Sequence, residues 1–109
     1  MTEQDAVRAL AALAQPSRLQ IFRQLIGVGP IGMTPTQLTE ALGLTPSTLS
    51  FHLKELMHAG LVTQQRDGRR LIYRPALLHM AALLSFLTAH CCQGQPCLAP
   101  LAPPCGPAP

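Results

Sequence analysis

The segment at residues 44–74, with the sequence LTPSTLSFHLKELMHAGLVTQQRDGRRLIYR, constrains the fold more than any other part of the chain. Thr45 is a favoured N-cap residue, and Pro46 stands at the first helical position, where its missing N–H is not needed. Large apolar side chains then recur at helical spacing and form one stripe: Leu49, Leu53, Leu56 and Met57. Gly60 ends this helix, and the basic segment with Asp-Gly at 67–68 predicts a β-hairpin. A helix followed by a basic hairpin is typical of a winged helix-turn-helix.

Three further helices are expected before this segment, at residues 2–14, 16–26 and 34–41. In the first helix, one side is lined by Val7, Leu10, Leu13 and Ala14. In the second and third, the side chains expected to face the core are Leu19, Phe22, Leu25 and Ile26, followed by Leu38 and Leu42. Gly43 lies in the short turn between the third helix and the long one. Two helices joined by such a turn form the helix-turn-helix signature.

The hairpin strands are expected at residues 61–66 and 69–74, with Leu61, Leu71 and Tyr73 available for packing. A last helix is expected at 76–89, and it is apolar nearly all round: Leu77, Leu78, Met80, Leu83, Leu84, Phe86 and Leu87. Such a helix must be buried, and too little chain remains to cover it. We therefore expect a homodimer in which Leu83 and Leu87 lie between two symmetry-related last helices.

The composition changes after residue 90, where the sequence CCQGQPCLAPLAPPCGPAP is rich in cysteine and proline. We therefore divide the chain into a winged helix-turn-helix domain for DNA binding and dimerisation at residues 1–90 and a C-terminal tail at 91–109. The prolines of the tail are incompatible with regular helix or strand. The tail is expected to be ordered only where something binds it.

Charge and cysteine usage restrict the class of protein further. The net charge is +3, and arginines cluster in the hairpin segment: Arg66, Arg69, Arg70 and Arg74. The N-terminus does not resemble a signal peptide, and no apolar stretch is as long as a membrane span, so a cytoplasmic location without a membrane partner is expected. The four cysteines are then expected to be reduced, as ligands or redox groups rather than disulfides.

The candidate DNA-binding residues come from the long helix and from the hairpin. The polar edge near the start of the helix carries Ser47, Thr48, Ser50, Phe51 and Lys54. Hydroxyl groups and an ammonium group suit base edges and phosphates, and a phenyl ring suits a thymine methyl group. Three arginines flank the hairpin tip and suit phosphates or the minor groove: Arg66, Arg69 and Arg70. We expect double-stranded operator DNA as the partner.

The chain resembles the ArsR/SmtB family of metal- and metalloid-sensing repressors over residues 7–89. The resemblance rests on the sequences QPSRLQIF, TPSTLSFHLKELMHAGLV and QQRDGRRLIYR, followed by the last apolar helix. It implies a winged-helix homodimer whose first and last helices form the interface and which leaves its operator when an inducer binds. Arsenic sensors of the best-known type carry Cys-x-Cys in the DNA-binding helix, whereas this chain has no cysteine before residue 91. Phe51 stands where many relatives have histidine.

The cysteines therefore indicate an inducer site in the tail. Soft thiolates select soft ions, and trivalent arsenic or antimony takes three sulfur ligands in a pyramid. Cys91 and Cys92 supply two sulfurs, and Gly94 with Pro96 allows a turn that brings Cys97 as the third. Their spacing does not suit a structural zinc site. Cys105 lies beyond a run of prolines and is only a fourth choice.

Other sensing chemistries and another class of protein remain open from the sequence. His79 and His90 have the spacing of the family's zinc site on the last helix, but Leu77 and Gln93 replace the expected carboxylates. A divalent-metal sensor or a thiol-redox sensor of the same fold is therefore an alternative. A thiol enzyme such as an arsenate reductase is disfavoured, because no cysteine lies in a Gly-rich anion loop or at a helix N-terminus. We expect neither an enzyme nor a catalytic cofactor.

Overall fold

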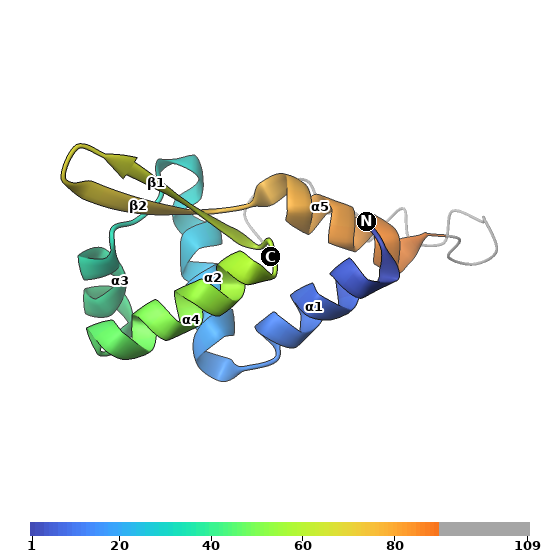
Figure 1. The fold of residues 1–109 in the computed structure, drawn as a ribbon, viewed down its shortest axis with the longest axis horizontal. Helices are drawn as coiled ribbons and strands as arrows, with labels where there is room; N and C mark the ends of the chain where they lie inside the picture. The colour runs from blue at the N-terminus through green and yellow to red at the C-terminus, as the bar shows by residue number, and fades with distance from the viewer. Residues whose placement is uncertain (90–109) are drawn as a thin grey trace, which may run out of the picture.

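The computed structural model describes residues 1–89 and confirms a mainly helical fold with one β-hairpin. Four helices and a short 3-10 turn precede the hairpin, and one helix follows it (Figure 1). In chain order the elements are α1 (Glu3–Leu13), α2 (Pro16–Val28), η1 (Gly29–Ile31), α3 (Pro35–Leu42), α4 (Pro46–His58), β1 (Val62–Asp67), β2 (Arg70–Pro75) and α5 (Leu77–Thr88). No helix in this part of the chain is long and apolar enough to cross a membrane.

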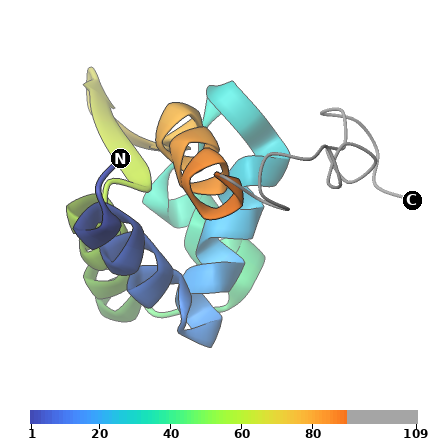
Figure 2. The same ribbon diagram turned by 90° about the vertical axis from the view of Figure 1, so that its right-hand side faces the viewer.

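The elements divide between two ends of an elongated molecule. Helix α3 and the hairpin lie at one end, and α1 and α5 lie side by side at the other (Figures 1 and 2). Helix α2 contacts α1, α3, α4 and β2, so it connects the two ends. The largest fully buried side chains come from α2, α3, α4 and the residue before β1: Ile21, Leu25, Leu38, Leu49, Leu53, Leu56 and Leu61. This core sets the orientation of α4 relative to the rest of the domain.

The helix starts expected from the sequence are confirmed. The Thr2 and Thr34 side chains each accept a hydrogen bond from a backbone N–H three residues ahead, and each forms a reciprocal capping box. Thr45 caps α4 by accepting from the N–H of Thr48 at 3.3 Å. Between α3 and α4, Gly43 adopts the left-handed conformation at φ +69°, which a residue without Cβ adopts at no steric cost. Local chemistry therefore defines the helix-turn-helix.

The hairpin turn lies one residue later than the sequence predicts. Asp67 pairs with Arg70, so the two-residue loop is Gly68-Arg69 and the strands run over 62–67 and 70–75. Gly68 has φ +66° and occupies the first central position, where a hairpin turn of the primed types requires a positive φ. The consequence for the candidate site is that Arg69 belongs to the tip itself rather than to a strand.

Several large apolar residues of α1 and α2 are exposed, although such side chains usually face the core. In α1 the core side consists of Ala6, Ala9 and Ala12, while Val7 is 61% exposed and Leu10 is 43% exposed. In α2, Ile21 is buried whereas Leu19 is 44% exposed, so the expectation that Leu19 faces the core is wrong. Small alanines allow α1 to approach its neighbours closely and leave the larger side chains on the outer surface.

Helix α5 keeps most of its apolar side chains on the surface of the single chain. Only Leu83 among its described residues is buried, at 4% exposed, and it belongs to the core of its own subunit. Placing Leu83 in an interface between subunits was therefore wrong. Met80 is partly buried against the core, and the other large apolar side chains of α5 are exposed: Leu77, Leu78, Leu84, Phe86 and Leu87. With Val7 and Leu10 of the neighbouring α1, they leave extensive apolar surface at one end of the molecule.

Candidate nucleic-acid interface

The predicted contact residues of α4 all lie on its surface. Exposed side chains extend along one edge from its first turn: Ser47, Thr48, Ser50, Phe51 and Lys54. The opposite stripe of α4 is buried in the core. Because the core holds one face, the other presents its polar groups in a fixed direction, as a recognition helix must.

The first turn of α4 contains a small network of hydroxyl groups. The Thr45 hydroxyl donates to the Thr48 hydroxyl oxygen at 2.8 Å and lies 3.5 Å from the Ser47 hydroxyl. A hydroxyl group that accepts in this way keeps its own proton for another partner. The Thr48 hydroxyl therefore has a proton available for donation to another group.

Phe51 is the most unusual side chain on this surface, with 55% of its area exposed. It lies one helical turn beyond Thr48, so the two share a face of α4. An apolar ring among hydroxyl groups is suited to contact with a thymine methyl group.

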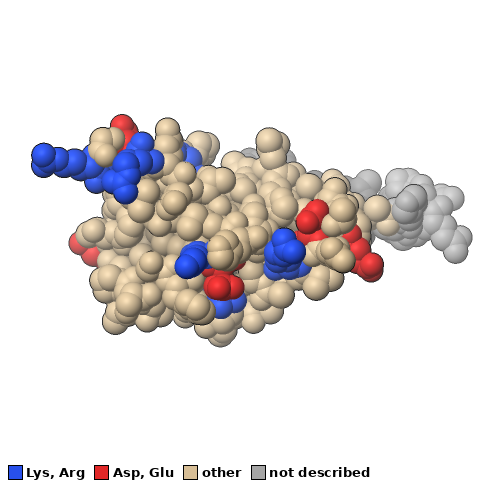
Figure 3. Space-filling model, in the orientation of Figure 1, with Lys and Arg blue, Asp and Glu red and all other residues tan. Residues whose placement is uncertain are grey.

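The hairpin supplies the positive charge of the surface. Arg66, Arg69 and Arg70 are exposed around its tip. Figure 3 shows Lys and Arg side chains gathered there around Asp67, and further acidic side chains lie at the start of α1 near the other end. The fourth arginine of the cluster differs, because Arg74 donates from Nε to the carbonyl oxygen of Pro30 at 2.7 Å and from Nη1 to Gln65. Arg74 therefore holds the base of the hairpin.

A contact between α2 and the exposed face of α4 was not predicted from the sequence. Arg18 of α2 donates from Nε to Nδ1 of His52 at 3.2 Å, and its guanidinium carbon lies 5.7 Å from the ring centre of Phe51. The Phe51 and His52 rings meet edge to face, with centres 5.5 Å apart. Burial lowers the pKa of His52, the Arg18 charge lowers it further, and Glu55 opposes the shift. The burial of His52 was visible in its spacing from Leu49 and Leu56, but its partner lies 34 residues away.

The predicted inducer ligands Cys91, Cys92 and Cys97 lie outside the described residues, as does His90. Within residues 1–89, no group of three or more His, Cys, Asp or Glu side chains is placed to hold a metal ion. His79 packs on Gly60, whose added Cβ would lie 3.0 Å from its Nε2. This Nε2 is buried without a hydrogen-bond partner among the described residues.

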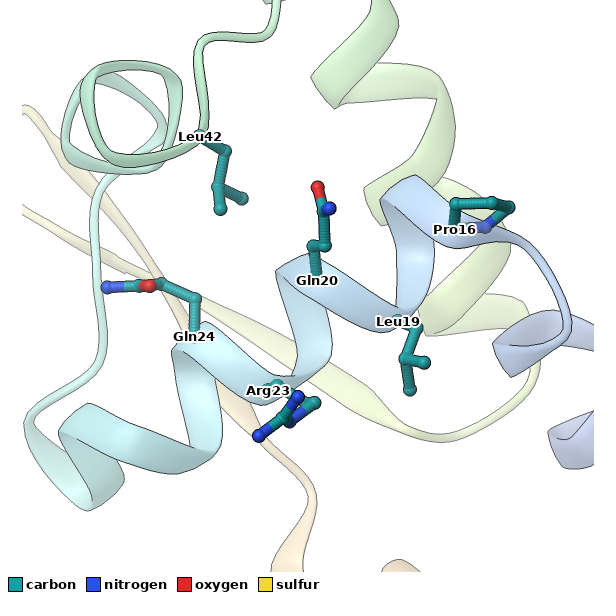
Figure 4. A pocket seen from close by; sticks show the side chains of 6 residues that line it. All are labelled: Pro16, Leu19, Gln20, Arg23, Gln24 and Leu42. Atoms are coloured by element: carbon teal, nitrogen blue, oxygen red, sulfur yellow. The ribbon is translucent and has the colours of Figure 1, made fainter.

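A groove of about 560 Å³ runs between α2 and α3 (Figure 4). Its lining is formed by Pro16, Leu19, Gln20, Arg23, Gln24 and Leu42. Leu42 and Gln20 point toward each other across it. The exposed Leu19 forms part of this lining, which accounts for its position outside the core. The groove walls carry amides and a guanidinium but no carboxylate, imidazole or thiol.

Comparison with known proteins decides the family. A family model described as a helix-turn-helix domain matches residues 13–65. The chain is 40% identical over 88 residues to the HTH-type transcriptional regulator CmtR of Mycobacterium bovis, covering 80% of this chain and 71% of CmtR. In structure it is similar to the homodimeric winged helix-turn-helix domain Mb0332 of Mycobacterium bovis, described as a possible ArsR-family transcriptional regulator. That match has a TM-score of 0.61 and 29% identity, and it covers 81% of this chain and 86% of that one. The chain belongs to the ArsR/SmtB family.

A further relative shows how much of a related protein the matched region covers. The HTH-type transcriptional regulator NmtR of Mycobacterium tuberculosis is 42% identical over 81 residues, which cover 74% of this chain but only 65% of NmtR. The chain thus spans slightly less than two thirds of the length of this ArsR/SmtB relative. The relatives are helix-turn-helix transcriptional regulators, which agrees with the expectation that this chain is not an enzyme.

Proposed function

We propose that this ArsR/SmtB family member is a homodimeric repressor that binds operator DNA and leaves it when trivalent arsenic or antimony binds to Cys91, Cys92 and Cys97. The observations that carry the DNA-binding part are the exposed edge of α4, where Phe51 stands among hydroxyl groups, and the three exposed arginines of the hairpin tip. The edge of α4 suits base contacts, and the arginines suit phosphates. Ser47, Thr48, Ser50, Phe51, Lys54, Arg66, Arg69 and Arg70 are the proposed contacts.

The homodimer is proposed from the apolar surface of α1 and α5. Leu78 is 88% exposed, Leu84 55% and Leu87 51%, and Val7 of the neighbouring α1 is 61% exposed. Apolar surface of this extent favours burial against a partner. A second copy offers the same surface, and the related Mb0332 domain is homodimeric. Two copies would present two α4 helices to successive turns of DNA.

The inducer site is proposed from the position of the cysteines in the chain. In the sequence, two residues separate Cys91 and Cys92 from Thr88, the last residue of α5. An ion bound there acts next to the helix that we assign to the interface. If the free dimer binds it better than the DNA-bound dimer does, the ion weakens DNA binding by the same factor. The zinc alternative is less favoured, because Nε2 of His79 is buried against Gly60.

The 109-residue chain and a random duplex library test this function. Repeated selection should enrich a two-fold symmetric sequence, and fluorescence anisotropy of the labelled selected duplex should show binding. Arsenite should then release the protein, whereas zinc and peroxide should not. Failure to enrich any duplex would contradict DNA binding. Release by zinc or peroxide alone would replace the metalloid with a divalent-metal or thiol-redox signal.

A further inference from the structure

The Arg18, His52 and Phe51 side chains form a cluster that connects α2 to the exposed edge of α4. His52 is 8% exposed and sits under this edge, whereas Phe51 beside it is 55% exposed. The Arg18 side chain spans both, with Nε on the His52 ring and the guanidinium toward the Phe51 ring. No other side-chain hydrogen bond in the described part of the chain joins α4 to another helix.

The hydrogen bond fixes the protonation state of His52. An arginine remains protonated in proteins, so its Nε always donates, and Nδ1 of His52 must accept with a lone pair. The neutral ring therefore carries its proton on Nε2. Protonation of Nδ1 would set two N–H groups and two positive charges against each other. The Arg18 contact is consequently available only to the neutral imidazole.

The position of the Arg18 guanidinium bears on the Phe51 ring. A cation within about 6 Å of an aromatic ring centre is attracted to the ring, and an exposed ring without such a contact samples more than one rotamer. The 5.7 Å separation places Arg18 at the limit of this range. The edge-to-face contact with His52 restricts the same ring from below. Both contacts favour one orientation of the ring on the surface proposed to meet base edges.

We infer that Arg18 is a specificity-determining positioning residue, which uses neutral His52 as its anchor to hold Phe51 in the orientation that contacts the operator. This inference rests on the proposed DNA-binding function. Its physical basis is preorganisation: a ring already in its binding orientation loses less conformational freedom when it meets a methyl group. Arg18 acts through Phe51 and makes no base contact of its own.

The charged and titratable groups around this cluster come from three helices. Arg18 of α2 and Glu55 of α4 act on His52, with opposite signs. Arg18 and Glu55 also line a second groove, of about 320 Å³. The other charged or titratable residues of this groove are Arg8 of α1 and His58 of α4. No charge from α3 or β1, which also pack on α4, contributes to the shift of the His52 pKa. A test by pH must therefore separate His52 from His58.

The first arm of the experiment compares Arg18→Ala with Arg23→Ala by anisotropy on the selected operator and on a scrambled duplex. Arg23 lies on the same helix and is exposed in the groove between α2 and α3. Its replacement therefore removes the same charge without touching the cluster. Arg18→Ala should weaken operator binding about tenfold and scrambled binding less than about twofold, with an unchanged salt slope. Arg23→Ala should change neither. An equal loss on both duplexes with a smaller salt slope would overturn the inference, because it would make Arg18 a phosphate contact.

The second arm varies the anchor and the pH. His52→Asn keeps an acceptor near the position of Nδ1 but cannot be protonated, and His52→Leu keeps only the apolar volume. At about pH 7.5, the Asn variant should bind the operator like the parent, and the Leu variant should bind like Arg18→Ala. As the pH falls below 6.5, the ordinary pKa of histidine, the parent should lose operator affinity relative to the Asn variant measured at the same pH. His58 is present in both proteins, so it cannot account for a difference between them. Parallel pH profiles for the two proteins would overturn the anchor role of His52.

A further variant keeps the test decisive if Arg18→Ala does not fold. Arg18→Gln retains an N–H donor at the position of Nε for His52, but it removes the guanidinium from Phe51. It should fold and still lose specific affinity, and unchanged operator binding by a folded Gln variant would overturn the inference. If the parent itself bound neither duplex, the proposed function would fail. The cluster would then be judged by NMR, where an unprotonated Nδ1 of His52 that becomes protonated in Arg18→Ala at the same pH supports the anchor.

Discussion

Met33 and Tyr73 exchange two backbone hydrogen bonds, with the Met33 N–H donating at 2.9 Å and the Tyr73 N–H donating at 2.8 Å. This bridge ties strand β2 to the segment between η1 and α3. Arg74 adds a side-chain bond from the next residue to the carbonyl oxygen of Pro30. The hairpin is therefore fixed to the helix-turn-helix at its base.

Gly32, next to this bridge, should not tolerate a side chain. It has φ +73°, and an added Cβ would lie 2.6 Å from the carbonyl oxygen of Tyr73 and 2.7 Å from Cγ2 of Ile72. Gly32→Ala should lower the free energy of unfolding by roughly 1–3 kcal/mol, measured by chemical denaturation. Gly27→Ala in α2 is the control, because its Cβ would meet nothing within 4 Å and alanine favours a helix. Equal stability of the two variants would contradict the close contact.

The local features of this fold were predictable from sequence, because they depend on neighbouring residues. Thr34 and Thr45 as caps and Gly43 in the turn follow from short-range chemistry, and all three are found as expected. The hairpin was predicted, but its turn shifted by one residue, since Asp-Gly and Gly-Arg both satisfy primed turns. Helical spacing alone cannot distinguish a core leucine from an interface leucine.

Residues that depend on tertiary contacts were not predictable in the same way. Leu83 and Leu87 look equivalent in the sequence, yet the first is 4% exposed and the second 51%. The difference arises from the way α5 lies against α1 and the core. Arg18 likewise has no local signal as a partner of His52, because the contact requires α2 to cross α4. The candidate site was therefore predicted in its surface residues but not in the residue that supports them.

The hairpin arginines and Thr48 should differ in how they affect sequence preference. Arg69→Ala with Arg70→Ala removes charge from the hairpin tip, so binding should weaken alike on operator and scrambled duplexes. The salt slope should fall by about one for each lost phosphate contact. Thr48→Ala should instead weaken binding to the operator more than binding to the scrambled duplex, by about 1 kcal/mol or slightly above. Anisotropy titrations at several salt concentrations measure both, and an equal effect of Thr48→Ala on both duplexes would argue against α4 as the recognition helix.

Substitutions at Leu87 and Leu83 should distinguish loss of the dimer from loss of the subunit fold. Leu87→Glu places a charge on exposed surface of α5, so the subunit should remain helical while sedimentation shows a monomer with lost operator binding. Leu83→Glu places the same charge in the core and should unfold the chain, because an unpaired charge is buried. A Leu87→Glu variant that sediments like the parent would rule out this face as the interface.

The buried His52 should make stability depend on pH. Its pKa is lowered in the folded chain from an ordinary value of 6.5, chiefly by burial and then by Arg18. The unfolded chain therefore binds a proton more readily, so stability is fully present above about pH 6.5 and decreases as the pH falls through the folded pKa. His52→Asn should lose less stability than the parent between about pH 7 and 5 in urea titrations. Curves that stay parallel over this range would show that His52 does not contribute.

The inducer site gives the most direct prediction for the proposed function. Cys91, Cys92 and Cys97 are expected to bind one trivalent arsenic per subunit through three thiolates. Loss of any one leaves two sulfurs, which hold the ion less tightly and leave a position open to water or free thiol. Each single Ser variant should therefore bind operator DNA normally but fail to release it with arsenite, while Cys105→Ser should respond like the parent.

Anisotropy of labelled operator during an arsenite titration measures this release, and mass spectrometry counts the bound arsenic. Release from Cys97→Ser together with failure of Cys105→Ser would make Cys105 the third ligand, and normal release from all four variants would exclude a metalloid site at these cysteines.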